Sequence, residues 1–311
     1  MKTNTRAIAT VSSLLMGAVM LLLAPSSARA QTTIDPAATI SPATTSGFAV
    51  GNGPTAVASD GVSVWVTNQF SNSVSRVGSD GTVLGTFAVG KNPTGIAFDG
   101  AHIWVANNGD DTVTKLTTDG KVLGTFAAGK GPEGVLAEGA NIWIADGKGD
   151  SVTKLSSAGI ALGTFTVGKR PVGLATDGSA IWVTNNKSNS VTKLSKDGVV
   201  LGTFAVGDGP FGIAFDGSSI WVANFFGGTL IKLGSDGTVL GKFAAGDGAA
   251  GVASDGSSVW VASNGTNTVI KLSPAGTVLG TYKVGRSPYG VALLGGTAWV
   301  ANSGSNTVSK Q

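Results

Sequence analysis

The stretch that decides the fold is IWVANNGDDTVTKL, residues 103–116. Two β-branched, apolar runs flank a polar turn, and the same pattern returns as IWIADGKGDSVTKL at 142–155 and IWVTNNKSNSVTKL at 181–194. All seven tryptophans keep this 39-residue interval, at positions 65, 104, 143, 182, 221, 260 and 299. A fixed period of this length indicates a repeat architecture, which has to be recognised before any local structure is predicted.

Each repeat contains four short runs of strand-forming residues. In the second repeat we expect strands near 95–98, 103–106, 112–116 and 122–127. Asx-Gly pairs such as Asp99-Gly100 separate them, because glycine accepts the positive φ of a tight hairpin turn. Four antiparallel strands in about 40 residues match one blade of a β-propeller. The predicted fold class is therefore all-β, a seven-bladed β-propeller with four-stranded blades of 39 residues.

The two ends of the repeat region predict how the ring closes. The last repeat stops at Lys310-Gln311, directly after its third strand. The sequence GFAVG at 47–51 matches the fourth-strand sequence TFAVG at 86–90. We expect this N-terminal strand to pair in the last blade, which would remove an exposed sheet edge.

The first 30 residues predict export. Lys2 and Arg6 precede an apolar run at 11–23, and the sequence ARA at 28–30 supplies an A-x-A cleavage site. This pattern is typical of a secretory signal peptide, and the apolar run is shorter than the roughly 20 residues that cross a bilayer. The expected location is the periplasm or the extracellular space, without stable insertion in a membrane.

The chain is therefore divided into a signal peptide at 1–30, a linker rich in Thr, Ala, Ser and Pro at 31–46, and a propeller at 47–311. Loss of the signal peptide leaves 18 Lys and Arg against 18 Asp and Glu. A neutral chain lacks the basic surface that nucleic-acid binding requires. There is no cysteine, so stability has to come from packing and not from disulfides. We expect a monomer that binds no nucleic acid.

The repeats differ mainly in the loops of one face. Alternating strand direction places the fourth-to-first and second-to-third loops together, and variation on one face of a regular scaffold commonly carries a binding site. The residue just before each expected first strand varies, as Thr55, Thr94, Glu133, Val172, Phe211, Ala250 and Tyr289. Aromatic residues of these loops predict a contact surface for a protein, peptide or glycan: Phe70, Phe211, Phe225, Phe226 and Tyr289. The alternative is that the phenylalanines pack into their own loops.

Four acidic residues belong to the loops of the same face: Asp110, Asp111, Asp146 and Asp150. Carboxylates suit a hard divalent cation, but the sequence contains no calcium-loop motif. We interpret these residues as solvated polar loops and expect no cofactor, with Mg or Ca reserved for an enzymatic alternative. The basic residue repeated at 39-residue intervals, such as Lys232, is likewise interpreted as a solvated residue at the blade edge.

The tetrapeptides WVAN and WVTN allow a comparison with known families. They occur at 104–107, 221–224, 65–68 and 182–185, and NTVS follows at 306–309. These motifs resemble the YVTN and NHL-type propellers, and more closely the virginiamycin B lyase-like group. The resemblance covers residues 47–311, and its motifs specify blades and not a reaction. It implies a seven-bladed enzyme that opens cyclic streptogramin lactones by elimination, using histidine and glutamate with magnesium.

The chain departs from that pattern at the residues that carry the reaction. Its single histidine, His102, stands beside a turn of the face opposite the variable loops, so the family's histidine base cannot be carried over. Of the two glutamates after residue 30, Glu133 lies near the expected channel mouth and is the candidate general base. We therefore carry over the fold and not the activity. The prediction is an exported binding or interaction scaffold, and the alternative is a metal-dependent lyase or hydrolase that uses Glu133.

Overall fold

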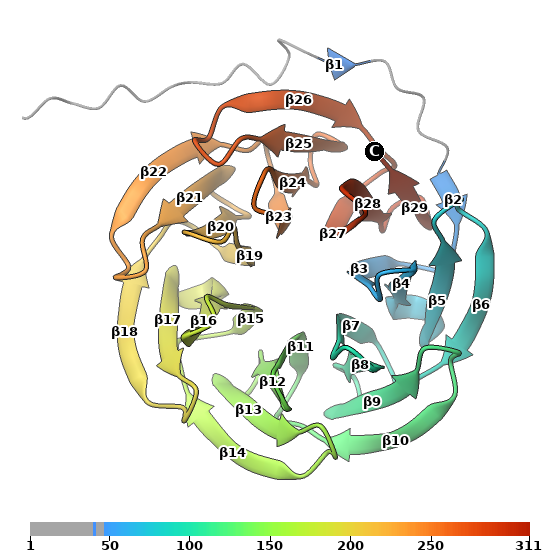
Figure 1. Cartoon of the computed structure of the whole chain (residues 1–311). Helices are drawn as coiled ribbons and strands as arrows, with labels where there is room; N and C mark the ends of the chain where they lie inside the picture. The colour runs from blue at the N-terminus through green and yellow to red at the C-terminus, as the bar shows by residue number, and fades with distance from the viewer. Residues whose placement is uncertain (1–39, 42–46) are drawn as a thin grey trace, which may run out of the picture. The chain divides into compact units, whose positions relative to one another are not determined.

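The computed structural model describes residues 40–41 and 47–311, so the expected signal peptide and most of the expected linker lie outside the described residues. The described residues belong to one compact unit, Thr32–Gln311. Seven sheets, each with four antiparallel strands and one with an added fifth strand, form a ring in this part of the chain, which confirms the predicted seven-bladed propeller (Figure 1). Two short 3-10 turns, η1 (Gln69–Ser71) and η2 (Asn186–Ser188), are its helical segments.

The blades follow one another around the ring in chain order, with the first strand of each innermost and the fourth outermost (Figure 1). Blade 1 consists of β3 (Pro54–Ser59), β4 (Ser63–Asn68), β5 (Ser73–Gly78) and β6 (Val83–Ala88). Blade 2 consists of β7 (Pro93–Phe98), β8 (His102–Asn107), β9 (Thr112–Thr117) and β10 (Val122–Ala127). Blade 3 consists of β11 (Pro132–Glu138), β12 (Asn141–Asp146), β13 (Ser151–Ser156) and β14 (Ala161–Thr166). Blade 4 consists of β15 (Pro171–Thr176), β16 (Ala180–Asn185), β17 (Ser190–Ser195) and β18 (Val200–Ala205).

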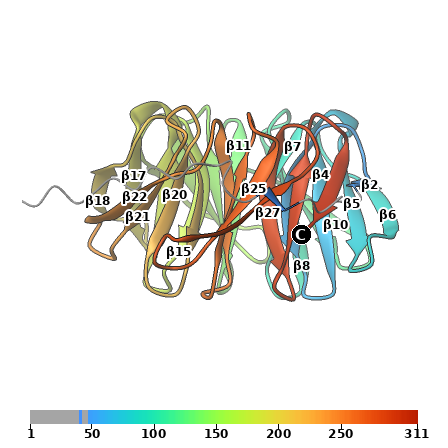
Figure 2. The same cartoon turned by 90° about the horizontal axis from the view of Figure 1, so that it is seen from above.

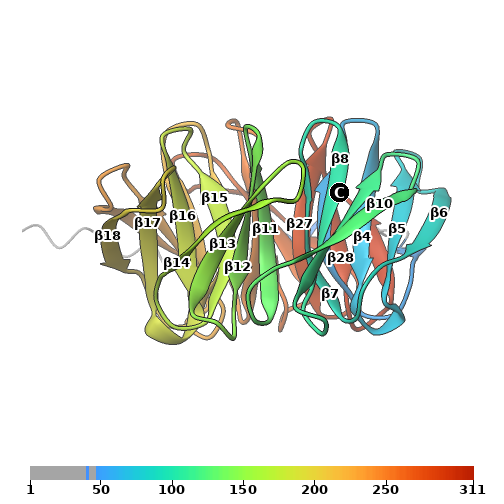
Figure 3. The same cartoon turned by 90° about the horizontal axis from the view of Figure 1, so that it is seen from below.

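The remaining blades repeat this arrangement. Blade 5 consists of β19 (Pro210–Phe215), β20 (Ile220–Asn224), β21 (Thr229–Leu233) and β22 (Val239–Ala244). Blade 6 consists of β23 (Ala249–Ser254), β24 (Val259–Ser263), β25 (Thr268–Leu272) and β26 (Val278–Lys283). Blade 7 consists of β27 (Pro288–Leu294), β28 (Thr297–Asn302), β29 (Thr307–Lys310) and β2 (Gly47–Ala49). Seen edge-on, the strands run between two opposite faces where the loops collect (Figures 2 and 3).

The core lies between neighbouring blades. The second strand of each blade is buried on both of its faces, whereas the fourth strand consists mostly of exposed and half-buried residues. Trp104 of blade 2 is fully buried and packs with Ile142 and Ile144 of blade 3, and the ring of Phe126 lies 5.6 Å from its own. An aromatic side chain of this size buries about 150–250 Å². The tryptophan repeated every 39 residues therefore joins each blade to the next.

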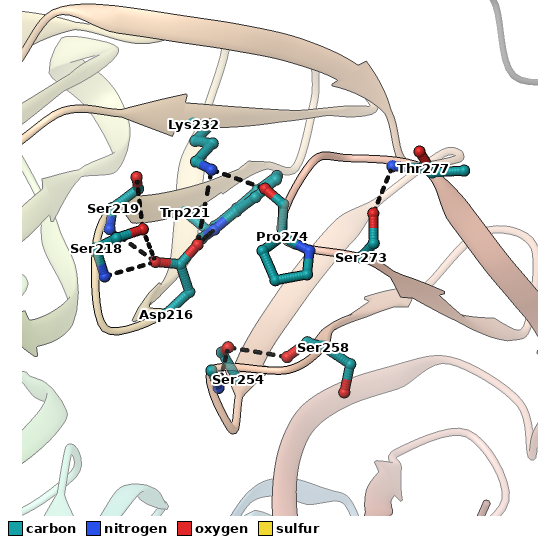
Figure 4. A network of polar contacts seen from close by, with 11 residues as sticks. Asp216, Ser218, Ser219, Trp221, Lys232, Ser254, Ser258, Ser273, Pro274 and Thr277 are labelled. Carbon is teal, nitrogen blue, oxygen red and sulfur yellow. Dashed lines mark hydrogen bonds and ion pairs between the residues drawn. The ribbon is translucent and has the colours of Figure 1, made fainter.

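The repeated basic residue also joins blades, so its interpretation as a solvated edge residue is wrong. Lys232 Nζ lies 5.2 Å from the ring centroid of Trp221 and donates a hydrogen bond of 2.7 Å to the carbonyl of Pro274 in the next blade (Figure 4). The same Nζ lies 3.8 Å from a carboxylate oxygen of Asp216. The aliphatic stem covers an indole while the ammonium group binds the neighbouring blade, an arrangement that lysine permits because its charge is confined to the tip.

The N-terminal segment closes the ring as the sequence predicts. Strand β2 pairs antiparallel with β29, with Phe48 opposite Val308, and completes blade 7. Phe48 also stacks against Trp299, with 5.8 Å between the ring centroids. Strand β1 (Ile40–Ser41), which falls within the expected linker, pairs in parallel with β26 and gives blade 6 a fifth strand. In the described part of the chain, no helix is long and apolar enough to cross a membrane.

Candidate functional site

A β-bulge in the innermost strand of each blade directs the variable residues toward the ring axis. In β11 the pairing passes from Pro132 opposite Asp146 to Val135 opposite Ile144, which leaves Glu133 and Gly134 out of register. The same irregularity in blades 5 and 7 contains Phe211 and Tyr289. Bulges are common next to functional sites because they change the direction of a side chain. The bulge therefore turns the side chains that vary most between the repeats away from the regular sheet.

A ring of glycines follows these residues and fixes their position. A β-carbon on Gly134 would lie 2.3 Å from the carbonyl oxygen of Val172 in the next blade. Equivalent contacts, all under 3 Å and all with backbone atoms of the next blade, occur at Gly95, Gly173, Gly212, Gly251 and Gly290. Real β-carbons do not approach so closely, so the innermost strands pack backbone against backbone around the axis. This rigid rim holds the variable side chains at the mouth of the channel.

A cavity of about 430 Å³ opens at this mouth, on the face of the variable loops. Its volume falls in the range of about 300–1,000 Å³ that is usual for small-ligand sites. Polar and charged side chains line it from blades 2 to 4, and aromatic side chains line it from blades 1, 5 and 7. The residues concerned are Asn108, Glu133 and Arg170 on the polar side and Phe70, Phe211 and Tyr289 on the aromatic side.

Glu133 is the acidic residue of the cavity wall. Burial raises the pKa of its carboxyl group, and the positive charges of Arg170 and Lys148 offset this only in part. Among the described residues its carboxylate makes no hydrogen bond and no ion pair. A raised pKa in a cavity is a property of many functional carboxylates, although structural groups share it.

Gly147 makes room for Glu133, and sequence reasoning missed it. A β-carbon at 147 would lie 2.7 Å from Cγ of Glu133. The repeats place Asn108, Asn186 and Asn264 at the same position in blades 2, 4 and 6. Alignment of the seven repeats could have identified Gly147, because only blade 3 combines a glycine at this position with a long acidic side chain at the bulge.

Arg170 is a second cavity residue that sequence reasoning missed. Its Nη1 donates to Oδ1 of Asn186 at 3.3 Å, and its backbone adopts φ +52°. The equivalent residue is a glycine in four other blades, at positions 53, 131, 209 and 248, each also with positive φ. An arginine at a repeated glycine position was the available signal. Residues held in this left-handed region often mark functional sites, because a side chain there is disfavoured.

The structure brings four of the five predicted aromatic residues together. The ring centroids of Phe211, Phe225 and Tyr289 lie 6.0–6.1 Å apart in a triangle. Phe226 meets Phe225 edge-on at 5.4 Å. These four residues form a continuous aromatic cluster that extends from the cavity, lined by Phe211 and Tyr289, to the outer surface.

Phe70 lies apart from this cluster, in blade 1, and also lines the cavity. Phe70 and Phe226 occupy equivalent positions, and each ring covers a turn glycine of its own blade, Gly53 or Gly209. The alternative that the phenylalanines pack into their own loops therefore holds for one side of each ring. The other side remains open, because Phe70 is 69% exposed and Phe226 is 65% exposed.

The acidic loop residues serve the backbone of their own loops. Asp146 is fully buried and accepts hydrogen bonds from the Gly129 amide, Ser151 Oγ and Thr153 Oγ1. Burial raises its pKa to about 6, against the lowering effect of those hydrogen bonds. The residue is an asparagine in five other blades, at positions 68, 107, 185, 224 and 302.

The other three acids are similarly engaged. Asp111 accepts from the Gly131 amide, Asp150 forms an ion pair of 2.7 Å with Lys169, and Asp110 lies 3.8 Å from Lys91 Nζ. Among residues 40–41 and 47–311, no three His, Cys, Asp or Glu side chains are grouped so that they could hold a metal ion. Each of the four carboxylates is engaged by a backbone amide or a lysine, so they do not fit the magnesium that the family resemblance implies. His102 begins β8, 3.6 Å from Asp99, on the face opposite the cavity.

Fold and site together define a seven-bladed β-propeller with a ligand-sized cavity at one mouth of its channel. The chain belongs to the virginiamycin B lyase family, whose sequence profile matches residues 43–310. A search of curated proteins finds no match.

Among solved structures, a streptogramin B lyase is similar with a TM-score of 0.76 and 19% identity, over 86% of this chain and 96% of the lyase. A catalytically inactive histidine-to-alanine variant of virginiamycin B lyase from Staphylococcus aureus with quinupristin gives a TM-score of 0.75 and 18% identity, over 86% and 98%. Hydrazine synthase of Kuenenia stuttgartiensis gives 0.73 and 18%, over 84% and 97%. At these identities the likeness extends to the fold alone, which hosts unrelated chemistries.

Proposed function

We propose that this protein is an exported binding propeller that takes a small molecule or a peptide or glycan segment into the mouth cavity of its variable face. The observation that carries the proposal is the cavity itself, with charged residues on one wall and aromatic residues on the other. Apolar walls with a few polar groups are typical of ligand sites. The aromatic cluster extends the contact surface beyond the cavity, since Phe226 stays largely exposed at its outer end.

A thermal-shift screen of the purified protein against cyclic peptides and glycans tests this proposal. A ligand present at 100 times its Kd stabilises a protein by roughly 2.7 kcal/mol, which a melting curve detects. We expect Phe211→Ala and Tyr289→Ala to weaken the binding of a compound found in the screen. The matched control is Phe243→Ala, which removes a ring from the blade core without touching the cavity. Unchanged affinity in both cavity variants would contradict the proposal.

The proposed role of Phe225 and Phe226 needs its own variant. The double change Phe225→Ala and Phe226→Ala removes the outer part of the aromatic cluster and leaves Phe211 and Tyr289 in place. If the outer cluster contributes to binding, a peptide or glycan found in the screen loses affinity in this variant. Binding that is unaffected would restrict the site to the cavity. Export is tested separately, by cell fractionation and by sequencing the N-terminus of the mature protein, which we expect to be Gln31.

The second candidate function is a lyase or hydrolase in which Glu133 acts as general base. Family membership supports it, together with the raised pKa of Glu133 and the absence of a hydrogen-bond partner for its carboxylate among residues 47–311. A base must reach the proton that it abstracts, and a cavity-facing carboxylate meets that requirement. Incubation with a streptogramin B lactone, with and without Mg²⁺, followed by mass spectrometry tests this function. Turnover that disappears in Glu133→Gln supports it, and a fully active Glu133→Gln variant would contradict the assignment.

A further inference from the structure

The charged wall of the cavity favours a negatively charged ligand group. Arg170 contributes a guanidinium group that is present at any ordinary pH. Within residues 47–311 this group makes one side-chain hydrogen bond, to Asn186, and no ion pair. A guanidinium has five N–H donors, so most of them remain available toward the cavity.

Glu133 does not neutralise the positive charge of Arg170 through an ion pair. No ion pair joins Glu133 to Arg170, and burial makes the charged form of the Glu133 carboxyl unfavourable, so its pKa is raised. Lys148 adds a second positive charge near Glu133, with its Nζ donating to Oδ1 of Asn108 at 3.2 Å. Whenever Glu133 is protonated, this wall presents the Arg170 guanidinium, with Lys148 close to Glu133 but outside the lining, and a neutral carboxyl group that can donate a hydrogen bond.

The opposite wall receives an apolar group. Phe211 and Tyr289 line it with their ring centroids 6.0 Å apart, and Phe225 supports both rings from behind the cavity lining. Aromatic faces of this kind contribute contact area to an apolar or aromatic body at little cost in side-chain entropy.

The backbone supports the same assignment. Arg170 occupies a turn position with positive φ, which is unfavourable for a residue with a side chain. Four other blades have a glycine at this position, which adopts the left-handed conformation without that cost. The only other side chains at this position are those of Asn92 and Ser287. Of the three residues with a side chain there, Arg170 alone lines the cavity and carries a charge.

We infer that the ligand of this cavity is a carboxylate attached to an aromatic or apolar body, with Arg170 binding the carboxylate and Phe211 and Tyr289 contacting the body. The inference rests on the proposed binding function. A peptide that ends in an aromatic residue has this chemistry. A cationic ligand is disfavoured because it would face Arg170.

Isothermal titration calorimetry with three matched probes tests the inference: N-acetyl-phenylalanine, its uncharged amide, and phenethylamine as the cation. We expect the carboxylate to bind about tenfold or more tightly than the amide, because hydrogen bonds to charged groups are the stronger ones. Arg170→Gly should abolish this preference while the melting temperature stays equal or rises, since glycine suits the turn. Ser287→Gly places a glycine at the equivalent left-handed position of blade 7, outside the cavity, and should leave binding unchanged.

The pH dependence separates an anionic ligand from a cationic one. The probe carboxylate stays ionised above about pH 5. Because burial raises the pKa of Glu133, the affinity of the probe should rise as the pH is lowered, since the protonated Glu133 no longer repels it. Glu133→Gln should remove this dependence. Asp146, whose pKa is about 6, pairs with Pro132 next to Glu133, and Asp111 contributes to its electrostatics, so the titration is repeated in Asp146→Asn. The pH dependence of binding should survive in that background.

The outcomes distinguish this inference from the proposed function. If the amide or the amine binds as well as the carboxylate, and Phe211→Ala weakens all of them, the cavity binds ligands but the carboxylate assignment is wrong. If none of the probes binds at millimolar concentration, the carboxylate assignment is overturned, and the thermal-shift screen alone decides the proposed function. If the probes bind without any effect of Phe211→Ala, Tyr289→Ala or Arg170→Gly, both the assignment and the proposed site are overturned.

Discussion

Gly147 and Glu133 occupy a shared space, because a β-carbon at 147 would lie 2.7 Å from Cγ of Glu133. The glycine belongs to the loop after the second strand of blade 3, and the acid belongs to the bulge of the first strand. In blades 2, 4 and 6 an asparagine fills the position of Gly147, and its side chain donates to the proline carbonyl of the next blade. Blade 3 lacks that inter-blade hydrogen bond and instead places a carboxylic acid at the cavity.

The first prediction concerns this pair. Gly147→Ala should displace the Glu133 side chain and change the pKa of its carboxyl group, because one of the two groups has to move. NMR titration of the Glu133 carboxyl carbon measures the change. Gly227→Ala is the control, since a β-carbon there meets nothing nearer than 3.5 Å. An unchanged Glu133 titration in Gly147→Ala would show that the acid does not depend on this space.

The second prediction concerns Asp146, whose pKa is about 6 in the folded protein against an ordinary value of 3.8. A folded-state pKa above the unfolded value means that protonation favours the folded state, so this contribution is fully present below about pH 4. It is lost as pH rises through about 6. Asp146→Asn should therefore increase the free energy of unfolding at pH 7.5, by about 1–3 kcal/mol, and change it little at pH 4.

The reason for the expected gain is visible in the neighbouring repeats. Asn107 occupies the same position in blade 2, and its amide donates to Thr112 and Thr114 while its oxygen accepts from the Gly90 amide. The asparagine side chain of the Asp146→Asn variant should make the same three hydrogen bonds without a buried charge. Urea unfolding at pH 4 and pH 7.5 checks this prediction, and an equal loss of stability at both pH values would contradict it.

The third prediction concerns Asp216, whose side chain is fully buried in blade 5 (Figure 4). Burial alone would raise the pKa of Asp216, but hydrogen bonds from Trp221 and the Ser218 and Ser219 amides outweigh it and hold the pKa below its ordinary value. Asp216→Ala should lower the free energy of unfolding by about 3–5 kcal/mol, because it leaves the indole N–H and Lys232 without this partner.

Asp255→Ala in blade 6 is the matched comparison. Asp255 accepts from Ser257 and Ser258, but the indole nitrogen of Trp260 has no partner in the structure. The expected loss is therefore smaller, about 1–2 kcal/mol. Equal losses in chemical denaturation of the two variants would show that the contacts of Asp216 with Trp221 and Lys232 contribute nothing.

The fourth prediction separates backbone strain from packing at two turn glycines. Gly100 and Gly120 have φ of +93° and +92°, but a β-carbon at 100 meets nothing, whereas one at 120 would lie 2.0 Å from the ring of Phe87 in the preceding blade. Gly100→Ala should cost about 1–2 kcal/mol from the left-handed conformation alone. Gly120→Ala should cost clearly more, because Phe87 has to leave the inter-blade core. Thermal unfolding of the two variants compares them, and similar losses would contradict this role of Phe87.

Most of the fold could be predicted from the sequence, because a 39-residue period repeats every local signal seven times. The strands of blade 2 lie where the pattern places them, and the first strand begins earlier, at Pro93, because the bulge extends it. The role of Lys232 could not be predicted. The period shows that a basic residue recurs but not that its ammonium group binds the next blade.

The candidate site was predictable only in part. The aromatic residues and Glu133 stand out because they break the repeat on one face, and the structure places Glu133, Phe70, Phe211 and Tyr289 around one cavity. Gly147 and Arg170 were missed, since a glycine and an arginine in a surface loop give no sign by themselves of what they face. The four acidic residues looked alike in sequence, yet Asp146 is fully buried whereas Asp110 is exposed and paired with Lys91.

The sequence by itself determined the blades, their number and the closure of the ring by residues 47–49, because these depend on local strand signals and on a period that is constant along the chain. Tertiary structure alone decided which variable side chains meet. Glu133, Arg170, Phe211 and Tyr289 come from four different blades, up to 156 residues apart in the chain. They share one cavity because the glycine ring brings the innermost strands together around the axis, and that convergence depends on how the closed blades pack.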